Sequence, residues 1–145
     1  MPRDPDLYGD DERVARILRE HSVWAVVGLS DSTIRPAYGV ARVLQAHGKR
    51  IVPVHPTART VHGERGYATL ADAVFEVGPV DVVDCFVNSA RVGAVIDDAI
   101  AVGAKAVWTQ LDVIDEQAAR RARDAGLEVV MDRCPAIEWR RHPAA

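Results

Sequence analysis

The sequence predicts an α/β domain built on a five-stranded parallel sheet with helices on both faces. Short apolar runs alternate with helical segments along the chain, and several of the helical segments end at a glycine. The apolar runs are rich in β-branched residues and lack polar alternation, which is typical of strands buried on both faces. Strict alternation of this kind favours parallel pairing through right-handed crossovers, so we expect a doubly wound, three-layer arrangement.

The apolar runs place the strands. The expected strands are 23–28 (VWAVVG), 50–54 (RIVPV), 80–87 (VDVVDCFV), 105–108 (KAVW) and 127–131 (LEVVM).

Helical periodicity fills the segments between these runs. The clearest case is 91–102, where apolar residues recur at the spacing of one helix face. Further helices are expected at 10–20, 38–47, 70–77 and 115–125, and a short one after Pro135. Glycines at 48, 103 and 126 follow three of these segments and are typical helix C-caps.

Length and composition indicate one domain. The chain has 145 residues, 48% of them hydrophobic and 27% charged, so we expect a polar leader over 1–9 and a single domain over 10–145. A net charge of -3 gives no general footprint for nucleic acid. We interpret the basic residues Arg140, Arg141 and His142 as a solvated tail. With no signal-like or membrane-length apolar stretch, we expect a cytoplasmic protein without a membrane partner.

The two cysteines do not indicate a metal site. Cys85 and Cys134 lack a CxxC partner or a nearby ligand cluster, so no structural zinc is expected. Cys85 fits a small buried hydrophobe. Trp108 and Trp139 are expected to be packing residues rather than stacking platforms.

A candidate ligand site lies where the strands end. In an open parallel sheet, ligands bind at the carboxyl ends of the strands, at the point where strand order reverses. The first exit, GLSDSTIRP, offers Gly28 for close backbone approach, the Ser30 and Ser32 hydroxyls, and a helix start near Pro36. These features suit a phosphate or pyrophosphate. An ordinary strand-to-helix turn is the alternative, because only one glycine of a GxGxxG pattern is clearly placed.

The second exit bears on the choice of cofactor. NAD-binding domains usually place an acidic residue about 20 positions past the glycine turn, where it binds the ribose. This chain has VPVHP there instead, with His55 at the exit and Arg59 as the nearest permanent cation. A ribose that carries a phosphate fits these residues, as in coenzyme A (CoA) or NADP. A surface loop without a ligand is the alternative.

The ordered motifs VVGLS, RPAYGV, IVPVHP, VDVVDCFV, AVGAKAVWTQ and GLEVVMDRCPAIE run from Trp24 to Glu138. This set resembles the small bacterial and archaeal CoA-binding domain proteins, which are stand-alone relatives of the N-terminal domain of the succinyl-CoA synthetase α subunit. The resemblance implies a Rossmann-like fold with CoA across the strand exits. This chain departs from the family in two places: His-Pro-Thr replaces the usual Asn-Pro-basic sequence after the second strand, and Gln110 is followed by Leu-Asp rather than by x-Gly.

The resemblance also implies a set of cofactor-binding residues. It assigns the pyrophosphate loop to Gly28, Leu29 and Ser30 with Arg35 beside them, the adenosine side to Val54, His55 and Pro56, the next wall to Val87, Asn88 and Ser89, and the far side to Thr109 and Gln110. Arg59 is added because it must supply the cation that other members carry directly after the proline.

Catalysis is not expected. The synthetase reaction uses a phosphohistidine on a second domain, which has no counterpart among the expected elements. No nucleophile-base arrangement can be argued from the strand exits. We therefore expect non-catalytic binding of CoA or an acyl-CoA, without a metal. The alternatives are an NADP-linked oxidoreductase, for which Tyr38 is the nearest tyrosine, and a scaffold with a vestigial pocket.

Cys134 is interpreted as a half-buried thiol. The alternative is a thiol that undergoes disulfide exchange with the thiol of CoA.

Overall fold

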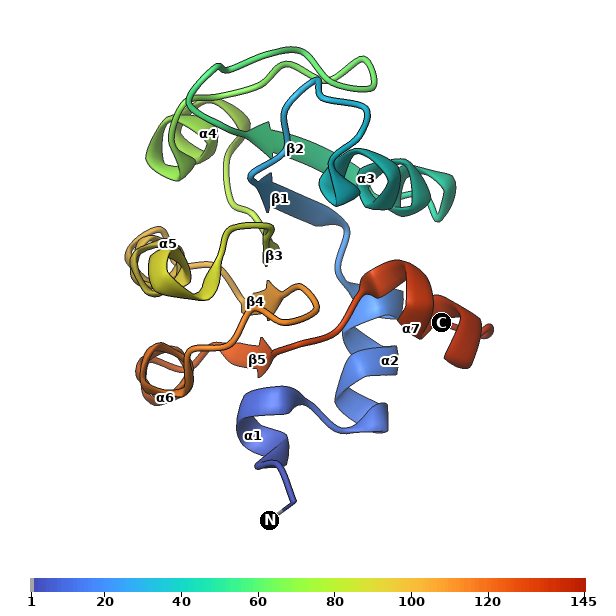
Figure 1. Ribbon diagram of the computed structural model, residues 1–145, viewed down its shortest axis with the longest axis vertical. Helices are drawn as coiled ribbons and strands as arrows, with labels where there is room; N and C mark the ends of the chain where they lie inside the picture. The colour runs from blue at the N-terminus through green and yellow to red at the C-terminus, as the bar shows by residue number, and fades with distance from the viewer. Residues whose placement is uncertain (1) are drawn as a thin grey trace.

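The computed structural model describes residues 2–145 and has three layers, with a parallel sheet between two layers of helices (Figure 1). The sheet has five strands in the order β2-β1-β3-β4-β5. The strands are β1 (Val23–Val27), β2 (Arg50–Val54), β3 (Val82–Cys85), β4 (Ala106–Thr109) and β5 (Glu128–Val130). The helices are α1 (Pro5–Tyr8), α2 (Asp11–Glu20), α3 (Pro36–Ala46), α4 (Leu70–Val77), α5 (Ser89–Ala101), α6 (Glu116–Asp124) and α7 (Pro135–Arg141).

The predicted fold class is confirmed, and every expected strand and helix is present. The largest difference at a strand is in β3, which begins at Val82 rather than at residue 80. Its predecessor Asp81 turns its carboxylate to the backbone N–H groups of Ser22 and Val23, at 3.0 and 2.9 Å. These hydrogen bonds join the start of β1 to the residue before β3, and the strand pairing of β3 begins after Asp81.

The strand order fixes where a ligand can bind. From β1 the chain first crosses to β2 on one side and later returns to β3 on the other. The exits of β1 and β3 are therefore neighbours, and their connections lead to opposite faces of the sheet. This switch point is where open α/β sheets hold their ligands.

Each face of the sheet has its own apolar layer. One layer packs beneath α4, α5 and α6, and it contains the fully buried Cys85, as predicted. The other lies beneath α2, α3 and α7 and is built around tryptophans, with the Trp24 and Trp108 ring centroids 5.7 Å apart. Trp139 is 4% exposed and stacks on His47 at 3.9 Å. The packing interpretation of Trp108 and Trp139 therefore holds.

The N-terminal leader over 1–9 contributes to the fold in its described part. It forms the single turn α1, whose Leu7 and Tyr8 are 1% and 6% exposed. The segment lies along the free edge of β5, where the Tyr8 carbonyl accepts from the Met131 N–H at 3.4 Å. Arg13 of α2 donates to the Val129 carbonyl at 3.2 Å. These contacts cover a strand edge that would otherwise present unpaired backbone groups.

The basic C-terminal residues were predicted to form a solvated tail, but Arg140 and Arg141, although exposed, belong to a helix. Arg140 and Arg141 belong to α7, and Arg141 donates to the buried carboxylate of Glu138 at 3.1 Å. His142 follows directly and is largely covered, with 18% of its side chain exposed. The prediction overlooked the acids Asp11 of α2 and Glu138 of α7, which pair with Arg141 and lie near His142.

Across the described residues 2–145, no helix combines the length and apolar character needed to cross a bilayer.

Candidate cofactor-binding site

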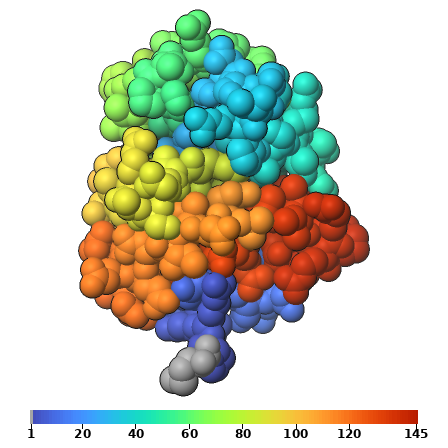
Figure 2. All heavy atoms as spheres, in the orientation of Figure 1, coloured from blue at the N-terminus to red at the C-terminus, as the bar shows by residue number. Residues whose placement is uncertain are grey.

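A cleft of about 1110 Å³ opens at the carboxyl ends of the strands, at the switch point between β1 and β3. Its walls come from the β1–α3 loop, the end of β2, the start of α4, the β3–α5 connection with one face of α5, and the β4–α6 loop. Figure 2 shows several of these segments adjoining on the facing side: the light-blue β1–α3 loop, the yellow start of α5 and the orange β4–α6 loop.

Most of the predicted site residues line this cleft. They are Gly28, Ser30, Arg35, Val54, His55, Pro56, Val87, Asn88 and Gln110. The others lie elsewhere: Leu29, Arg59, Ser89 and Thr109 are outside its lining.

Gly28 brings the ends of β1 and β3 together. Its φ is 100°, which only glycine adopts readily. A Cβ at this position would lie 2.6 Å from the Phe86 carbonyl oxygen. The Gly28 N–H donates to the Val54 carbonyl at 2.8 Å, so the same residue also ties the loop to β2. Glycine is therefore required here by the packing of three strand exits, in addition to any ligand.

The rest of the first loop combines an anchor with exposed polar groups. Leu29 is 1% exposed and packs in the tryptophan layer, so its side chain holds the loop down. The Ser30 hydroxyl accepts from the Ser32 N–H at 3.2 Å. Arg35 is the N-cap residue of α3 and makes no capping bond with its side chain, and Pro36 opens the helix. The first-turn N–H groups of α3 are thus left without a side-chain cap at the cleft wall.

His55 is held by its own turn. Its Nδ1 lies 2.9 Å from the Thr57 hydroxyl and 3.2 Å from the Thr57 N–H, which donates to it. Nδ1 is therefore the acceptor, and the neutral ring carries its proton on Nε2. An imidazole N–H that donates to a phosphate oxygen is available in either protonation state.

Arg59 lies in an open hollow beside the cleft rather than in it. That hollow is lined by Asp31, Thr57, Ala58, Arg59 and Thr60, so it joins the loop after β1 to the loop after β2. The backbone there is closely packed, because a Cβ on Gly66 would lie 2.2 Å from the Arg59 carbonyl oxygen. The position of Arg59 is therefore fixed by the loop itself.

Ser89 and Thr109 hold the β4–α6 loop. The Ser89 hydroxyl donates to the Asp112 carbonyl at 3.1 Å and accepts from the Ile114 N–H at 2.9 Å. Thr109 is fully buried and donates to the Val113 carbonyl at 2.6 Å. Both hydroxyls are used within the protein, so these residues shape the cleft wall without facing it.

Gln110 is a buried acceptor that lines the cleft. Only 8% of the residue is exposed, and its Oε1 has no hydrogen-bond partner among the described residues. A buried polar atom without a partner costs about 1–3 kcal/mol. A donor from a bound molecule would remove that cost, which makes Gln110 a marker for where a ligand N–H or O–H lies.

The sequence interpretation missed the contribution of α5. Asn88 caps this helix by accepting from the Arg91 N–H at 3.1 Å, and the helix then presents Ala90, Arg91, Ala94, Val95 and Asp98 to the cleft. Within residues 2–145, neither Arg35 nor Arg91 has an ion-pair partner, whereas many other arginines do. The sequence places Arg91 in the first turn of a helix after a strand exit, but it does not show which face of that helix turns to the cleft.

The described residues contain no group of three or more His, Cys, Asp or Glu side chains arranged to hold a metal ion.

Fold and site together place an open cleft at the switch point of a doubly wound sheet, where such sheets hold their ligands. The sequence pattern of the CoA binding domain family matches residues 22–140, and the chain belongs to that family. It is 31% identical over 121 residues to the uncharacterized protein YneT of Bacillus subtilis, covering 83% of this chain and 87% of that protein.

Solved structures share the fold of this chain. A hypothetical protein from Pyrococcus horikoshii OT3 is 32% identical, with a TM-score of 0.86 over 97% of this chain and 98% of that one. A dinucleotide-forming acetyl-coenzyme A synthetase from Ca. Korarchaeum cryptofilum is 27% identical with a TM-score of 0.65. The match covers 80% of this chain but only 26% of the synthetase. The shared part is thus about a quarter of that larger protein.

Proposed function

We propose that this protein binds CoA or an acyl-CoA in the cleft at the β1/β3 switch point and does not itself catalyse a reaction. The observation that carries the proposal is the charge of the cleft. Arg35 and Arg91 lie on walls from different elements and have no ion-pair partner within residues 2–145, and the end of β2 supplies His55 instead of an acid. CoA carries a pyrophosphate and a ribose 3′-phosphate, which are anions that these cationic side chains can bind. Membership of the CoA binding domain family also supports CoA as the ligand.

The chemistry of the lining supports binding rather than catalysis. The ionisable side chains that line the cleft are Arg35, His55, Arg91 and Asp98. His55 uses Nδ1 on Thr57 of its own turn rather than on a carboxylate that would orient it as a general base. The two cysteines lie outside the cleft lining. We therefore assign the described residues no catalytic role.

NADP is the competing cofactor, because it also carries a ribose phosphate. A hydride-transfer enzyme would need a proton donor in the cleft, and Tyr38 was the nearest tyrosine in the sequence. In the structure its ring lies 4.2 Å from the His62 ring, and it is outside the cleft lining. This position favours CoA binding over an NADP-linked oxidoreductase.

Isothermal titration with CoA, NADP, NAD and dephospho-CoA tests the proposal. We expect CoA to bind, NADP to bind at least 10-fold more weakly, and NAD to bind more weakly still. Native mass spectrometry of the freshly purified protein should show a mass increment equal to CoA or an acyl-CoA. Binding of NADP with no binding of CoA would overturn the proposal, and failure of all four ligands would favour a scaffold with a vestigial pocket.

A further inference from the structure

A second hollow of about 500 Å³ lies at the end of β5, between α1, the β4–α6 loop and α7. It is lined by Arg3, Pro5, Tyr8, Gly9, Asp10, Leu111, Met131, Asp132, Arg133, Cys134, Ile137, Glu138 and Arg141. Leu111 lines both this hollow and the cofactor cleft. The two spaces therefore adjoin along the β4–α6 loop, with Gln110 on the side of the cleft.

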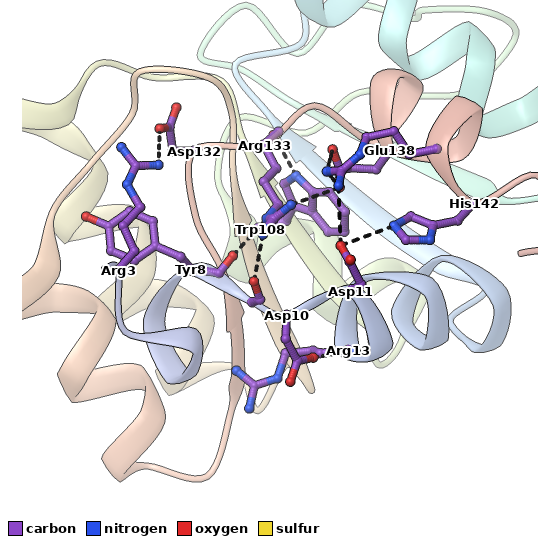
Figure 3. A network of polar contacts seen from close by, with 12 residues as sticks. Arg3, Tyr8, Asp10, Asp11, Arg13, Trp108, Asp132, Arg133, Glu138 and His142 are labelled. Atoms are coloured by element: carbon purple, nitrogen blue, oxygen red, sulfur yellow. Dashed lines mark hydrogen bonds and ion pairs between the residues drawn. The ribbon is translucent and has the colours of Figure 1, made fainter. Parts of the chain in front are cut away.

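The charged groups around the second hollow already have partners (Figure 3). Arg3 binds Asp132 at 2.6 Å, and Arg133 binds Glu138 at 3.0 Å. Arg133 also donates to the Tyr8 and Gly9 carbonyls, at 3.0 and 2.7 Å. These contacts fasten the N-terminal segment to the end of β5, and they leave the guanidinium groups poorly placed to bind a further anion.

The unused surface of the hollow is apolar. Leu111 and Ile137 are 47% and 37% exposed, and they are two of the most exposed large hydrophobic residues of the chain. Pro5 also lines the hollow, together with the buried Met131 and Cys134. Two exposed aliphatic side chains on one hollow form a surface that gains free energy when an apolar group covers it.

Two aspartates near Leu111 adopt left-handed backbone conformations. Asp112 and Asp132 have φ values of 65° and 60°, a region that non-glycine residues adopt uncommonly. The Asp112 N–H donates to the Asp132 carboxylate at 2.6 Å. This bond fixes the loop directly after Leu111, and residues held in such conformations cluster at binding sites.

We propose that the second hollow receives the acyl group of a bound acyl-CoA, and that this group is a neutral aliphatic chain of several carbons. The inference rests on the proposed function. Adjacent strands are about 4.8 Å apart, so the end of β5 lies about 10 Å across the sheet from that of β3. The pantetheine arm of CoA is longer than that, and one of its amide N–H groups would meet the unpartnered Oε1 of Gln110.

The chemistry of the hollow determines the acyl class. An acyl chain that ends in a carboxylate would meet Asp132 and Glu138, whose arginine partners are already engaged. A hydrocarbon chain would instead cover Leu111 and Ile137. Selection should therefore favour hexanoyl-CoA over both acetyl-CoA and adipoyl-CoA.

Titration with CoA, acetyl-CoA, hexanoyl-CoA and adipoyl-CoA tests this inference. Burial of one methylene is worth about fourfold in affinity, so four half-buried methylenes should make hexanoyl-CoA bind about 10- to 20-fold more tightly than acetyl-CoA. Adipoyl-CoA should bind no better than acetyl-CoA. If CoA binds but hexanoyl-CoA gains less than threefold over acetyl-CoA, the acyl site is wrong and the proposed function stands. If no CoA compound binds, both are wrong.

Two variants test whether the tighter binding of hexanoyl-CoA comes from contacts in the second hollow. Ile137→Asn and Leu111→Asn should each reduce the ratio of hexanoyl-CoA to acetyl-CoA affinity to about threefold or less. Ile137 lies outside the cofactor cleft, so Ile137→Asn should leave the affinity for CoA unchanged. Phe75→Asn is the matched control, because Phe75 is 86% exposed on α4 and lines neither space. An unchanged ratio in both hollow variants, with native melting temperatures, would overturn the inference.

Discussion

Asp84 of β3 lies directly opposite Trp108 of β4 in the parallel ladder, and both residues are fully buried. Val26 of β1 is the partner of Asp84 on the other side of β3. Neither carboxyl oxygen of Asp84 has a hydrogen-bond partner among the described residues. Burial in this tryptophan-rich layer raises the pKa of Asp84 well above its usual value, because a charge without water or a partner is costly there. Burial thus favours the protonated form of this carboxyl group on the central strand.

The first prediction concerns the pH dependence of stability. A raised folded-state pKa means that the folded protein holds a proton that the unfolded chain releases above about pH 3.9. The free energy of unfolding of the wild type should therefore fall, relative to Asp84→Asn, as pH rises above about 4. The slope is about 1.4 kcal/mol per pH unit until the folded-state pKa is reached. Urea denaturation of both proteins from pH 4 to pH 8 measures it.

The comparison with the variant isolates Asp84 from acids with lowered pKa values. The Arg16 guanidinium lowers the pKa of Glu128, and such groups contribute stability that is lost on acidification, the opposite sign. They are present in both proteins and cancel in the difference. Glu76→Gln on the exposed face of α4 is the control. Equal pH profiles for wild type and Asp84→Asn would show that Asp84 is ionised in the fold.

The second prediction concerns Gly28. Alanine there would place a methyl group 2.6 Å from the Phe86 carbonyl oxygen, in a backbone conformation with a φ of 100°. We expect Gly28→Ala to lower the free energy of unfolding by roughly 2–4 kcal/mol, since a clash adds to the conformational strain. Gly48→Ala separates the two causes, because Gly48 has a φ of 81° but nothing within 4 Å of an added Cβ. Chemical denaturation should find the Gly48 change much milder, and equal losses would rule out the clash.

The third prediction concerns the leader. Leu7 is 1% exposed and packs in the layer beneath α4, α5 and α6, so Leu7→Ala should destabilise the protein by about 2–4 kcal/mol. A leader that merely preceded the domain would tolerate the change. Pro2→Ala, at an exposed position of the same segment, is the control. A Leu7→Ala protein with the same melting temperature as the Pro2→Ala control would contradict the observed packing.

The sequence located elements well and side-chain directions poorly. Uninterrupted β-branched runs such as 50–54 predict a buried strand because no other structure hides both faces. The turn α1 carries only two large apolar side chains, Leu7 and Tyr8, and is too short to show periodicity, so its packing could not be predicted. At a strand exit, a shift of one residue turns a side chain to the other face. Thr109 and Gln110 illustrate this, since the first supports the loop and the second lines the cleft.

Arg59 and Arg91 also show that the sequence does not predict the direction of a side chain. Arg59 was predicted from the loop after β2, and the structure places it in the hollow that adjoins the loop after β1. Arg91 was not predicted, because its role depends on which face of α5 turns to the cleft. Spacing along the chain could identify the helix and its cap. Only the packing of α5 against its neighbours decides that Arg91 faces the ligand space.

The last prediction distinguishes these two arginines by the phosphate that each contacts. Arg91 lines the main cleft, where the pyrophosphate is expected, so Arg91→Ala should weaken CoA and dephospho-CoA alike by about 10- to 150-fold, the worth of one charge-assisted hydrogen bond. Arg59 lies in the adjoining hollow, which suits the ribose 3′-phosphate.

Arg59→Ala should therefore weaken CoA by about 3- to 10-fold, because water competes at this exposed position. It should leave dephospho-CoA, which lacks the 3′-phosphate, unchanged. Arg140→Ala is the control. Arg140 is exposed on α7 and lines neither the cofactor cleft nor the hollow that contains Arg59. Isothermal titration of both ligands against all three variants measures the pattern. A loss for dephospho-CoA with Arg59→Ala would place the 3′-phosphate elsewhere, and His55 at the end of β2 would then be the residue to replace.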